Sequence, residues 1–430
     1  MVILLIFSIF SIYWGALWKT PVGGLEGWIV DFDADQIGTS ISRAILSPPS
    51  SDSSSIPSGS TIPASTRQLV KWTQIPASRF PGGPAQLAHE VLEEKVWVGV
   101  AINPNSTSRY LASLSNPNAS YAGTDAMTVY AVEARNENAY RSLIRPYIQT
   151  SFAGVTASFA SQAARQLASN STSLGNVLAT SPQTLTAPVG YTIHNLAPFD
   201  VPVASAVTFV GLLYQLIISF FVVMISTAAR ETSQLQTLLT TRSLIILRFG
   251  SSFLAYFVLS LFYCLLSVAF QLPLTRKFGH AGFVVFWMLN YAGMLSVGLA
   301  LEAMLTLLTV SFIAFFMLTW IIANVAVCIF PLEVLPSIYR YGYAAPFYNV
   351  SQAMRTIIFG TKNRVGFHFA ILIVWIVISC FTLPLIQILV RRREVRRVGI
   401  NTVVGEDGSE VKREEEREMV ALRERDGPGQ

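Results

Sequence analysis

Long apolar stretches dominate the chain from Ala204 to Val390, where charge and proline interrupt them at only a few places. Phe249–Phe270 carries no charge, and Ala281–Phe330 carries only Glu302. A helix that rises about 1.5 Å per residue needs roughly 20 apolar residues to cross a bilayer core of about 30 Å. The longer stretch therefore predicts two crossings, with the break between them near Gly298–Ala303.

The whole pattern predicts helices in the membrane, because backbone groups in hydrocarbon must be satisfied within their own segment. Residues 1–18 are expected to form an uncleaved anchor rather than a signal peptide, since they lack a basic leader and a clean cleavage site. Residues 204–390 are expected to form a five-helix membrane domain. The predicted helices are Val2–Trp18, Ala204–Ala228, Phe249–Phe270, Ala281–Leu301, Met304–Phe330 and Phe367–Val390.

Residues 19–203 differ from the rest, because they are polar and rich in Ser, Asn, Thr and Pro. Strand-like and helix-like patterns alternate there, which is typical of a small α/β domain. The expected strands are Trp28–Asp33, Lys95–Ile102 and Ala126–Glu133, and the expected helices are Gln36–Leu46, Ala85–Glu94, Ser106–Ser115 and most of Asn138–Ser169. Residues 47–66 are low in complexity and predict a flexible loop. The predicted fold is thus a membrane all-α bundle of six helices (one plus five), with a small extracellular α/β domain after the first.

Glycosylation sequons and positive charge indicate the sidedness. The sequon asparagines are Asn105, Asn118, Asn170 and Asn349, and all of them fall on segments that this topology places outside. The tail, residues 391–430, begins RRREVRR and fits the positive-inside rule, whereas Lys19, Arg276 and Lys277 disagree mildly. We therefore expect both termini in the cytoplasm and a multi-pass plasma-membrane protein; an endomembrane location is the alternative.

Composition supports an integral membrane protein. The chain is 52% hydrophobic and only 13% charged, against about 25% charged residues in soluble domains. The formal net charge of +5 is spread along the chain, so it predicts no nucleic-acid surface. All three cysteines, at positions 264, 328 and 380, lie in predicted membrane helices, which argues against a disulfide-stapled domain.

Motifs for catalysis or cofactor binding are absent from the sequence. It contains no GxxxxGK[ST] phosphate loop and no GxSxG elbow, and its four histidines are scattered. Asp31, Asp33 and Asp35 alternate as in a calcium loop, but the glycine and glutamate of an EF-hand are missing. A cap on the following helix is the simpler interpretation of Asp33 or Asp35. We expect no enzyme, cofactor or metal site.

Polar residues inside predicted membrane segments are candidates for a pathway or for helix contacts. They are few: Gln215, Asn290, Glu302 and Asn324. Glu302 is expected in a tight solvated turn near the inner surface. The basic stretch Ala228–Ile246 predicts an amphipathic cytoplasmic helix, either a plain connection or a docking element.

The predicted outer loop, residues 331–366, is unusually aromatic. Its candidate interface residues are Tyr341, Tyr343, Phe347, Tyr348 and Arg355. Aromatic residues at this density are typical of the membrane–water interface. A short re-entrant or surface-lying helix is expected at Tyr348–Phe359.

Four motifs carry a resemblance to a known family: FSIYWGALWKT, WIVDFDADQIG, LAPFDVPVASAVTFVG and RYGYAAPFYNVSQAMRTIIFGTKN. The chain resembles the fungal nitrosoguanidine-resistance membrane proteins over nearly its whole length. That family is similar in topology to the membrane subunits of type-2 ABC exporters and to phage-infection proteins. The resemblance implies roles in drug resistance, efflux or lipid distribution. The chain departs from the pattern in its shortened N-terminus and in having no nucleotide-binding domain.

The expected function is export of, or resistance to, toxic small molecules. The alternative is a non-transporting membrane regulator or scaffold, for example of plasma-membrane lipid distribution. The expected partners are membrane lipids, together with either a second copy of the chain or a separate ATPase subunit, and no nucleic acid.

Overall fold

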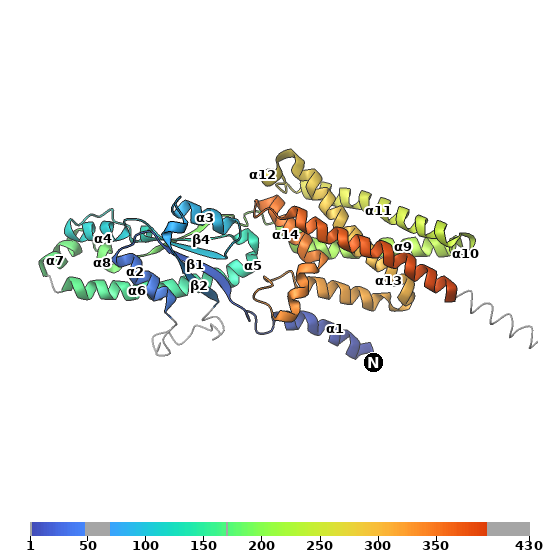
Figure 1. Cartoon of the computed structure of the whole chain (residues 1–430), viewed down its shortest axis with the longest axis horizontal. Helices are drawn as coiled ribbons and strands as arrows, with labels where there is room; N and C mark the ends of the chain where they lie inside the picture. The colour runs from blue at the N-terminus through green and yellow to red at the C-terminus, as the bar shows by residue number, and fades with distance from the viewer. Residues whose placement is uncertain (1, 48–68, 169–170, 394–430) are drawn as a thin grey trace, which may run out of the picture.

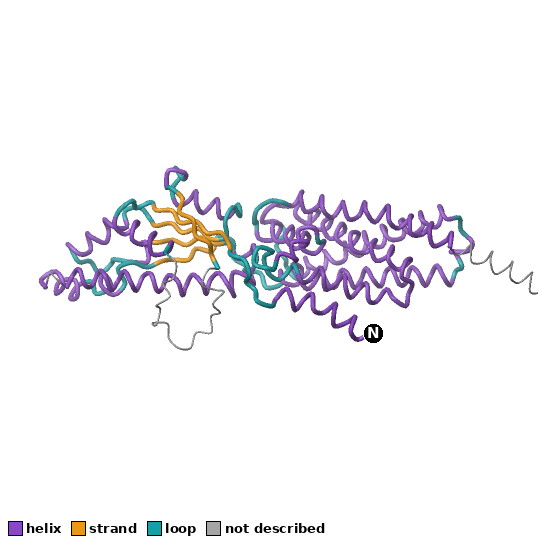
Figure 2. The backbone as a smooth tube through the Cα atoms, turned by 60° about the horizontal axis from the view of Figure 1, so that its bottom comes forward, coloured by secondary structure: helices purple, strands orange, loops and turns teal. Residues whose placement is uncertain are grey.

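The computed structural model describes residues 2–47, 69–168 and 171–393. Most of the low-complexity loop, Asn170 and nearly all of the charged tail lie outside the described residues. Figure 1 shows an elongated molecule with a sheet domain at one end and a helical bundle at the other. Figure 2 shows that the bundle helices run roughly along the long axis, with loops gathered where the two parts meet.

The sheet has five strands in the order β2-β1-β3-β4-β5. They are β1 (Leu25–Asp31), β2 (Val70–Ile75), β3 (Val98–Ile102), β4 (Met127–Ala131) and β5 (Tyr191–Asn195). Only β3 and β4 pair antiparallel; the other pairs are parallel. All residues of β3 are buried because this strand is central and covered on both faces. The predicted small α/β domain is thus a mixed sheet with helices on it.

Helices cover both faces of the sheet. α2 (Gln36–Leu46) and α6 (Arg145–Ala168) pack on the face of Ile29 and Val98, and α4 (Ser106–Ser115) contacts α2. α3 (Pro84–Leu92) packs on the other face. α5 (Glu137–Ala139) and the π-helix η5 (Tyr140–Ile144) lead into α6, while α7 (Ser171–Thr180) and α8 (Gln183–Thr186) follow it.

The predictions for α2 and α4 are confirmed residue for residue. α2 begins where expected because the Asp35 side chain accepts a hydrogen bond from the Gln36 backbone N–H. The other two aspartates also stabilise local structure. The Asp31 carboxylate accepts a hydrogen bond from the Asp33 backbone N–H, and the Asp33 carboxylate accepts one from the Thr107 hydroxyl.

Within residues 2–47, 69–168 and 171–393, four helical stretches of the bundle are long and apolar enough to cross a membrane. They are Ala206–Thr232, Thr241–Ala269, Thr275–Ala326 and Val365–Arg393. They contain the π-helix η6 (Ala206–Val210) and α9 (Gly211–Thr232), then α11 (Thr241–Ala269), then α12 (Thr275–Phe278) and α13 (Gly282–Ala326). α1 (Val2–Leu17) is shorter and packs against α13. The prediction of a helical membrane protein is confirmed.

The break predicted near Gly298–Ala303 is wrong. α13 continues through Glu302 and departs from helical geometry only at Thr309, where φ is 66° and ψ is 169°. Beyond Thr309 the chain returns toward the sheet domain, where the Ile329 carbonyl accepts a hydrogen bond from Asn136. Gly298 marks a close approach rather than a break, because a side chain there would collide with Tyr256.

The predicted amphipathic helix over Ala228–Ile246 is also wrong. α9 ends at Thr232, the single turn α10 (Leu235–Leu238) follows, and α11 begins at Thr241. The Thr240 hydroxyl caps α11 by accepting a hydrogen bond from the Ser243 N–H at 3.3 Å. The segment between α9 and α11 is therefore a loop with one helical turn, and a new helix begins after Thr240.

Candidate functional site

A buried cluster of charge lies at the end of the bundle opposite the sheet domain. The carboxylate Oε1 of Glu302, on α13, accepts from Arg230 Nη2 at 2.8 Å and from Arg248 Nε at 2.7 Å. Arg230 comes from the last turns of α9 and Arg248 from α11. Glu302 is only 1% exposed, and the arginines are 6% and 5% exposed. The solvated turn expected for Glu302 is therefore wrong; its charge is balanced by arginines from two neighbouring helices.

Arg248 joins most of the elements in this cluster. Its Nη2 donates to the Glu302 carbonyl at 3.0 Å and to Thr306 Oγ1 at 2.6 Å, and its Nη1 donates to Gln387 on the last helix. A guanidinium has five donors in a rigid fork, so one side chain can fix several helices at once. Breaking this contact would free α11, α13 and the last helix from each other at this end.

A cavity of about 230 Å³ adjoins the charge cluster. Arg230 and Arg248 line it together with Thr306, Gln387 and Arg391. Within the part of the chain described, Glu302 Oε2 has no hydrogen-bond partner. Charged groups inside membrane segments are costly and commonly mark a functional site. The cluster and its cavity are therefore the candidate site.

Sequence reasoning missed the two arginines as site residues. The sequence pattern did not single out either arginine, although Arg248 lies seven residues after the start of α11, inside an apolar run. The position of Arg248 in an apolar run could have indicated a buried ion pair, because an arginine within a membrane helix normally pairs with an acidic residue. Glu302 was the only acidic residue of the long apolar stretch.

The other intramembrane polar residues bond to their neighbours. Gln215 donates to Asn290 across α9 and α13, and Asn290 also donates to the Phe286 carbonyl at 2.7 Å. Asn324 accepts from the Phe347 N–H at 3.2 Å. The Gln215–Asn290 and Asn324–Phe347 bonds join different helices, which is the contact role that the sequence left open beside a pathway role.

The aromatic loop contains a buried helix, α14 (Pro346–Phe359), where a helix at Tyr348–Phe359 was expected. It does not lie on a surface, because every residue except Tyr348 and Gln352 is buried. Arg355, 2% exposed, donates to Glu137 on α5 and to the Ala134 carbonyl at 3.0 Å. Phe359 stacks on Phe199 with ring centroids 4.6 Å apart. α14 thus connects the bundle to the sheet domain.

Of the remaining interface residues, Phe347 and Tyr348 lie in the first turn of α14, and Tyr341 and Tyr343 precede it. Tyr341 and Tyr343 are exposed, and the Tyr341 hydroxyl donates to the Ala323 carbonyl at 2.7 Å. Phe347 is buried, and the Tyr348 ring meets the Tyr343 ring edge-on at 5.9 Å. These aromatic side chains therefore cover the junction around α14.

A second set of charges lies at the junction near α3. Arg135 stands 3.5 Å over the Trp97 ring and 3.9 Å from both Glu94 and Glu333. Burial raises the pKa of Glu94, although the Arg135 charge opposes this, and burial lowers the pKa of Arg135. Arg135 therefore connects Glu94 of the sheet domain with Glu333, which follows α13 in the helical bundle.

The sequon asparagines have different surroundings. Asn105 and Asn118 are exposed on the sheet domain. Asn349 is fully buried; it donates to the carbonyls of Tyr343 and Ala345 and meets His368 Nδ1 at 2.8 Å. A glycan on Asn349 is incompatible with this packing.

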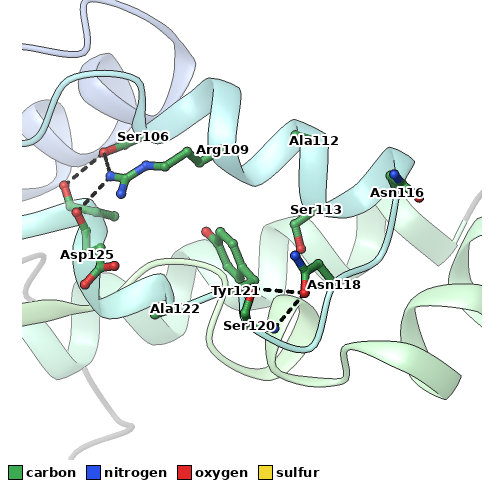
Figure 3. A pocket seen from close by; sticks show the side chains of 11 residues that line it. Ser106, Arg109, Ala112, Ser113, Asn116, Asn118, Ser120, Tyr121, Ala122 and Asp125 are labelled. Atoms are coloured by element: carbon green, nitrogen blue, oxygen red, sulfur yellow. Dashed lines mark hydrogen bonds between the residues drawn. The ribbon is translucent and has the colours of Figure 1, made fainter.

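The sheet domain holds another cavity, of about 420 Å³, shown in Figure 3. Arg109 lies toward Asp125 at one end and donates to its carbonyl at 3.0 Å, and Asn118 and Ser120 lie at the other end. Burial raises the pKa of Tyr121, which lines the cavity, to about 12. This cavity is polar and far from the charged cluster. Among the described residues, no three His, Cys, Asp or Glu side chains form a metal site.

Comparisons with known proteins agree with this architecture. The sequence model of the family described as "Protein of unknown function (DUF3533)" matches residues 1–381. An uncharacterized endoplasmic reticulum membrane protein of Saccharomyces cerevisiae, YJR015W, is 29% identical over 304 residues, which cover 69% of this chain and 59% of that protein. No solved structure matches the chain significantly. The chain belongs to the DUF3533 family, and it is a multi-pass membrane protein.

Proposed function

We propose that this protein forms the membrane pathway of an exporter that confers resistance to toxic small molecules. In this proposal α1, α9, α11, the two limbs of α13 and the last helix make six crossings, with the sheet domain outside and both termini in the cytoplasm. The resemblance to nitrosoguanidine-resistance proteins and exporter subunits supports this layout. The endoplasmic reticulum relative favours the endomembrane alternative over the plasma membrane.

One observation carries the proposal: the buried Glu302 pairs with Arg230 and Arg248 beside a cavity. A bundle that served only as an anchor could place aliphatic side chains there, often at no cost in stability. An ion-pair cluster can instead adopt a closed and an open arrangement, because its partners lie on different helices. We assign the cluster as the inner gate of the pathway.

These 430 residues contain no GxxxxGK[ST] phosphate loop, and the proposal therefore assigns ATP hydrolysis to a separate ATPase subunit. Co-purification of the full-length chain from its native membrane tests for that partner. Recovery of an ATPase in a fixed ratio supports an exporter of the two-part kind.

Flux through reconstituted vesicles tests the function directly. Purified protein, alone and with any ATPase recovered with it, is assayed for movement of a fluorescent cationic dye and of a radiolabelled nitrosoguanidine. We expect Glu302→Gln to change the flux at least about tenfold, and Glu26→Gln, an exposed carboxylate of the sheet domain far from the cavity, to leave it unchanged. Absence of flux for both probes in every preparation would remove the transport proposal.

A non-transporting regulator of lipid distribution is the second candidate. The hydrogen bond that Gln215 donates to Asn290 favours it, because paired side chains offer a passing substrate fewer free polar groups. Deletion of the gene in its host, followed by measurement of phosphatidylserine exposure at the cell surface, distinguishes the candidates. Altered exposure with no change in drug efflux supports the regulator.

A further inference from the structure

A groove lies between two helix ends beside the candidate site. It has a volume of about 1040 Å³ and is formed by the first turns of α11 and the last turns of the final helix. Three arginines and three isoleucines line it: Arg242, Arg391, Arg392, Ile245, Ile246 and Ile388. No carboxylate lines the groove within the described chain. The lining is therefore suited to a molecule with an anionic part and an apolar part.

The arginines differ in how they are held. Arg391 donates to the Leu239 carbonyl at 2.9 Å, so its guanidinium is fixed in place. Arg242 and Arg392 are exposed. Neither has an ion pair within the ranges that the structure covers. Their charges are available to an anion, and the positive N-terminal end of the 29-residue α11 adds to the same field.

The isoleucines place the groove at the membrane surface. Ile246 is 62% exposed and Ile388 is 38% exposed, and both continue the apolar outer surface of the bundle. A helix as long as α11 extends roughly 44 Å at 1.5 Å per residue, so its ends pass beyond a hydrocarbon core of about 30 Å. The arginines then lie at headgroup depth, while the isoleucines meet acyl chains.

We propose that this groove is a binding site for one anionic phospholipid, with the phosphate between Arg242 and Arg392 and the acyl chains along the isoleucines. Basic pockets between membrane helices are suited to such headgroups. Arg391 lines both this groove and the cavity beside Glu302, so the lipid would contact a wall of the candidate site. The proposal does not depend on whether the protein transports anything.

Binding of a fluorescent phosphatidylserine to the purified full-length protein tests the proposal. We expect phosphatidylserine to bind at least about tenfold more tightly than phosphatidylcholine with the same chains. Removal of Arg242 and Arg392 in R242Q/R392Q should raise the Kd by roughly ten- to thirtyfold, given about fivefold for each basic residue near a membrane surface. Arg393→Gln removes another exposed charge one residue farther along; because Arg393 does not line the groove, the Kd should change less than about twofold.

Further measurements separate the lipid from other occupants. Ile246→Gln should weaken phosphatidylserine binding, because it removes the acyl-chain contact. Glycerol 3-phosphate should compete only at far higher concentration; competition as strong as that of the intact lipid would show a site for free anions and overturn the proposal. Equal loss of binding in Arg393→Gln, or no preference for phosphatidylserine in the wild-type protein, would also overturn it. Thermal unfolding of each variant verifies that the fold is retained.

Discussion

Arg355 on α14 is ion-paired with Glu137 on α5, although 218 residues separate them in the chain. Removing either partner leaves a buried charge without compensation, which costs about 3–5 kcal/mol, whereas removing both costs less. We expect Arg355→Gln and Glu137→Gln each to lower the melting temperature of the detergent-purified protein by several degrees. The double variant should melt above the less stable single variant; strictly additive losses would contradict the pairing.

The same pair predicts a dependence on pH. Burial alone would raise the pKa of Glu137, but the charge and hydrogen bond of Arg355 outweigh it, and the pKa lies below the ordinary 4.5. An acid with a lowered folded-state pKa stabilises the fold above its unfolded value and loses that contribution as pH falls through the folded value. Between about pH 5 and 3, the wild-type melting temperature should therefore fall more steeply than that of Glu137→Gln. Parallel curves would show that Glu137 does not contribute.

Glu302 offers a test of the charged cluster that needs no substrate. Glu302→Gln leaves Arg230 and Arg248 buried without their counter-charge and should cost about 3–5 kcal/mol. Arg248→Lys keeps the charge but loses the fork of donors, so an intermediate loss is expected. Glu231→Gln serves as the matched control, since Glu231 is exposed. Unfolding in detergent measures all three, and a wild-type melting curve for Glu302→Gln would contradict the burial of the cluster.

Two glycines in the bundle should respond to alanine in opposite directions. A Cβ on Gly298 would collide with the Tyr256 side chain, whereas a Cβ on Gly250 meets nothing within 4 Å. We expect Gly298→Ala to cost about 1–3 kcal/mol through overpacking. Gly250→Ala should be neutral or stabilising by up to about 1 kcal/mol, because alanine favours the helix. The difference between the two melting temperatures is the measurement, and its reversal would contradict the close contact of α11 and α13.

Glycosidase treatment distinguishes the sequons. The proposed topology places the sheet domain outside the cytosol, where Asn118 would be available, so Asn118→Gln should remove one step of glycosidase-sensitive mass on a gel. Asn349→Gln should leave the mass unchanged, because Asn349 is buried in hydrogen bonds. It should instead destabilise the protein by about 1–3 kcal/mol, since the polar groups around it lose their partner. A glycan on Asn349 would contradict the position of α14.

Local signals explain which elements of the sheet domain the sequence could predict. α2 has an aspartate cap and clear helical periodicity, so its bounds followed from nearby residues alone. Neither β2 nor β5 is among the strands that the sequence predicted. Both are edge strands of the sheet. An edge strand has fewer buried residues, and its pattern is correspondingly less apolar than that of β3.

The candidate site depended on contacts between distant segments. Glu302 stood out as a charge in an apolar stretch, but only the tertiary structure brings Arg230 and Arg248 to it. The bend at Thr309 was predicted too early in the chain, near Gly298–Ala303, for the same reason. Glu302 suggested a solvated turn because its partners were not known. A glycine such as Gly298 suggests a break in a helix when its neighbours are unknown, but the structure shows that the Tyr256 ring packs against it.

The place of the first helix has a consequence for biosynthesis. The Tyr339 hydroxyl donates to the Ile12 carbonyl at 2.6 Å across 327 residues of sequence. At about 5–20 residues per second, a ribosome takes roughly 15 to 65 s to make that intervening chain. In the proposed six-crossing topology, the newly inserted helix waits in the bilayer for its lasting neighbour, and insertion machinery or a chaperone that shelters it during that interval would set the yield of folded protein.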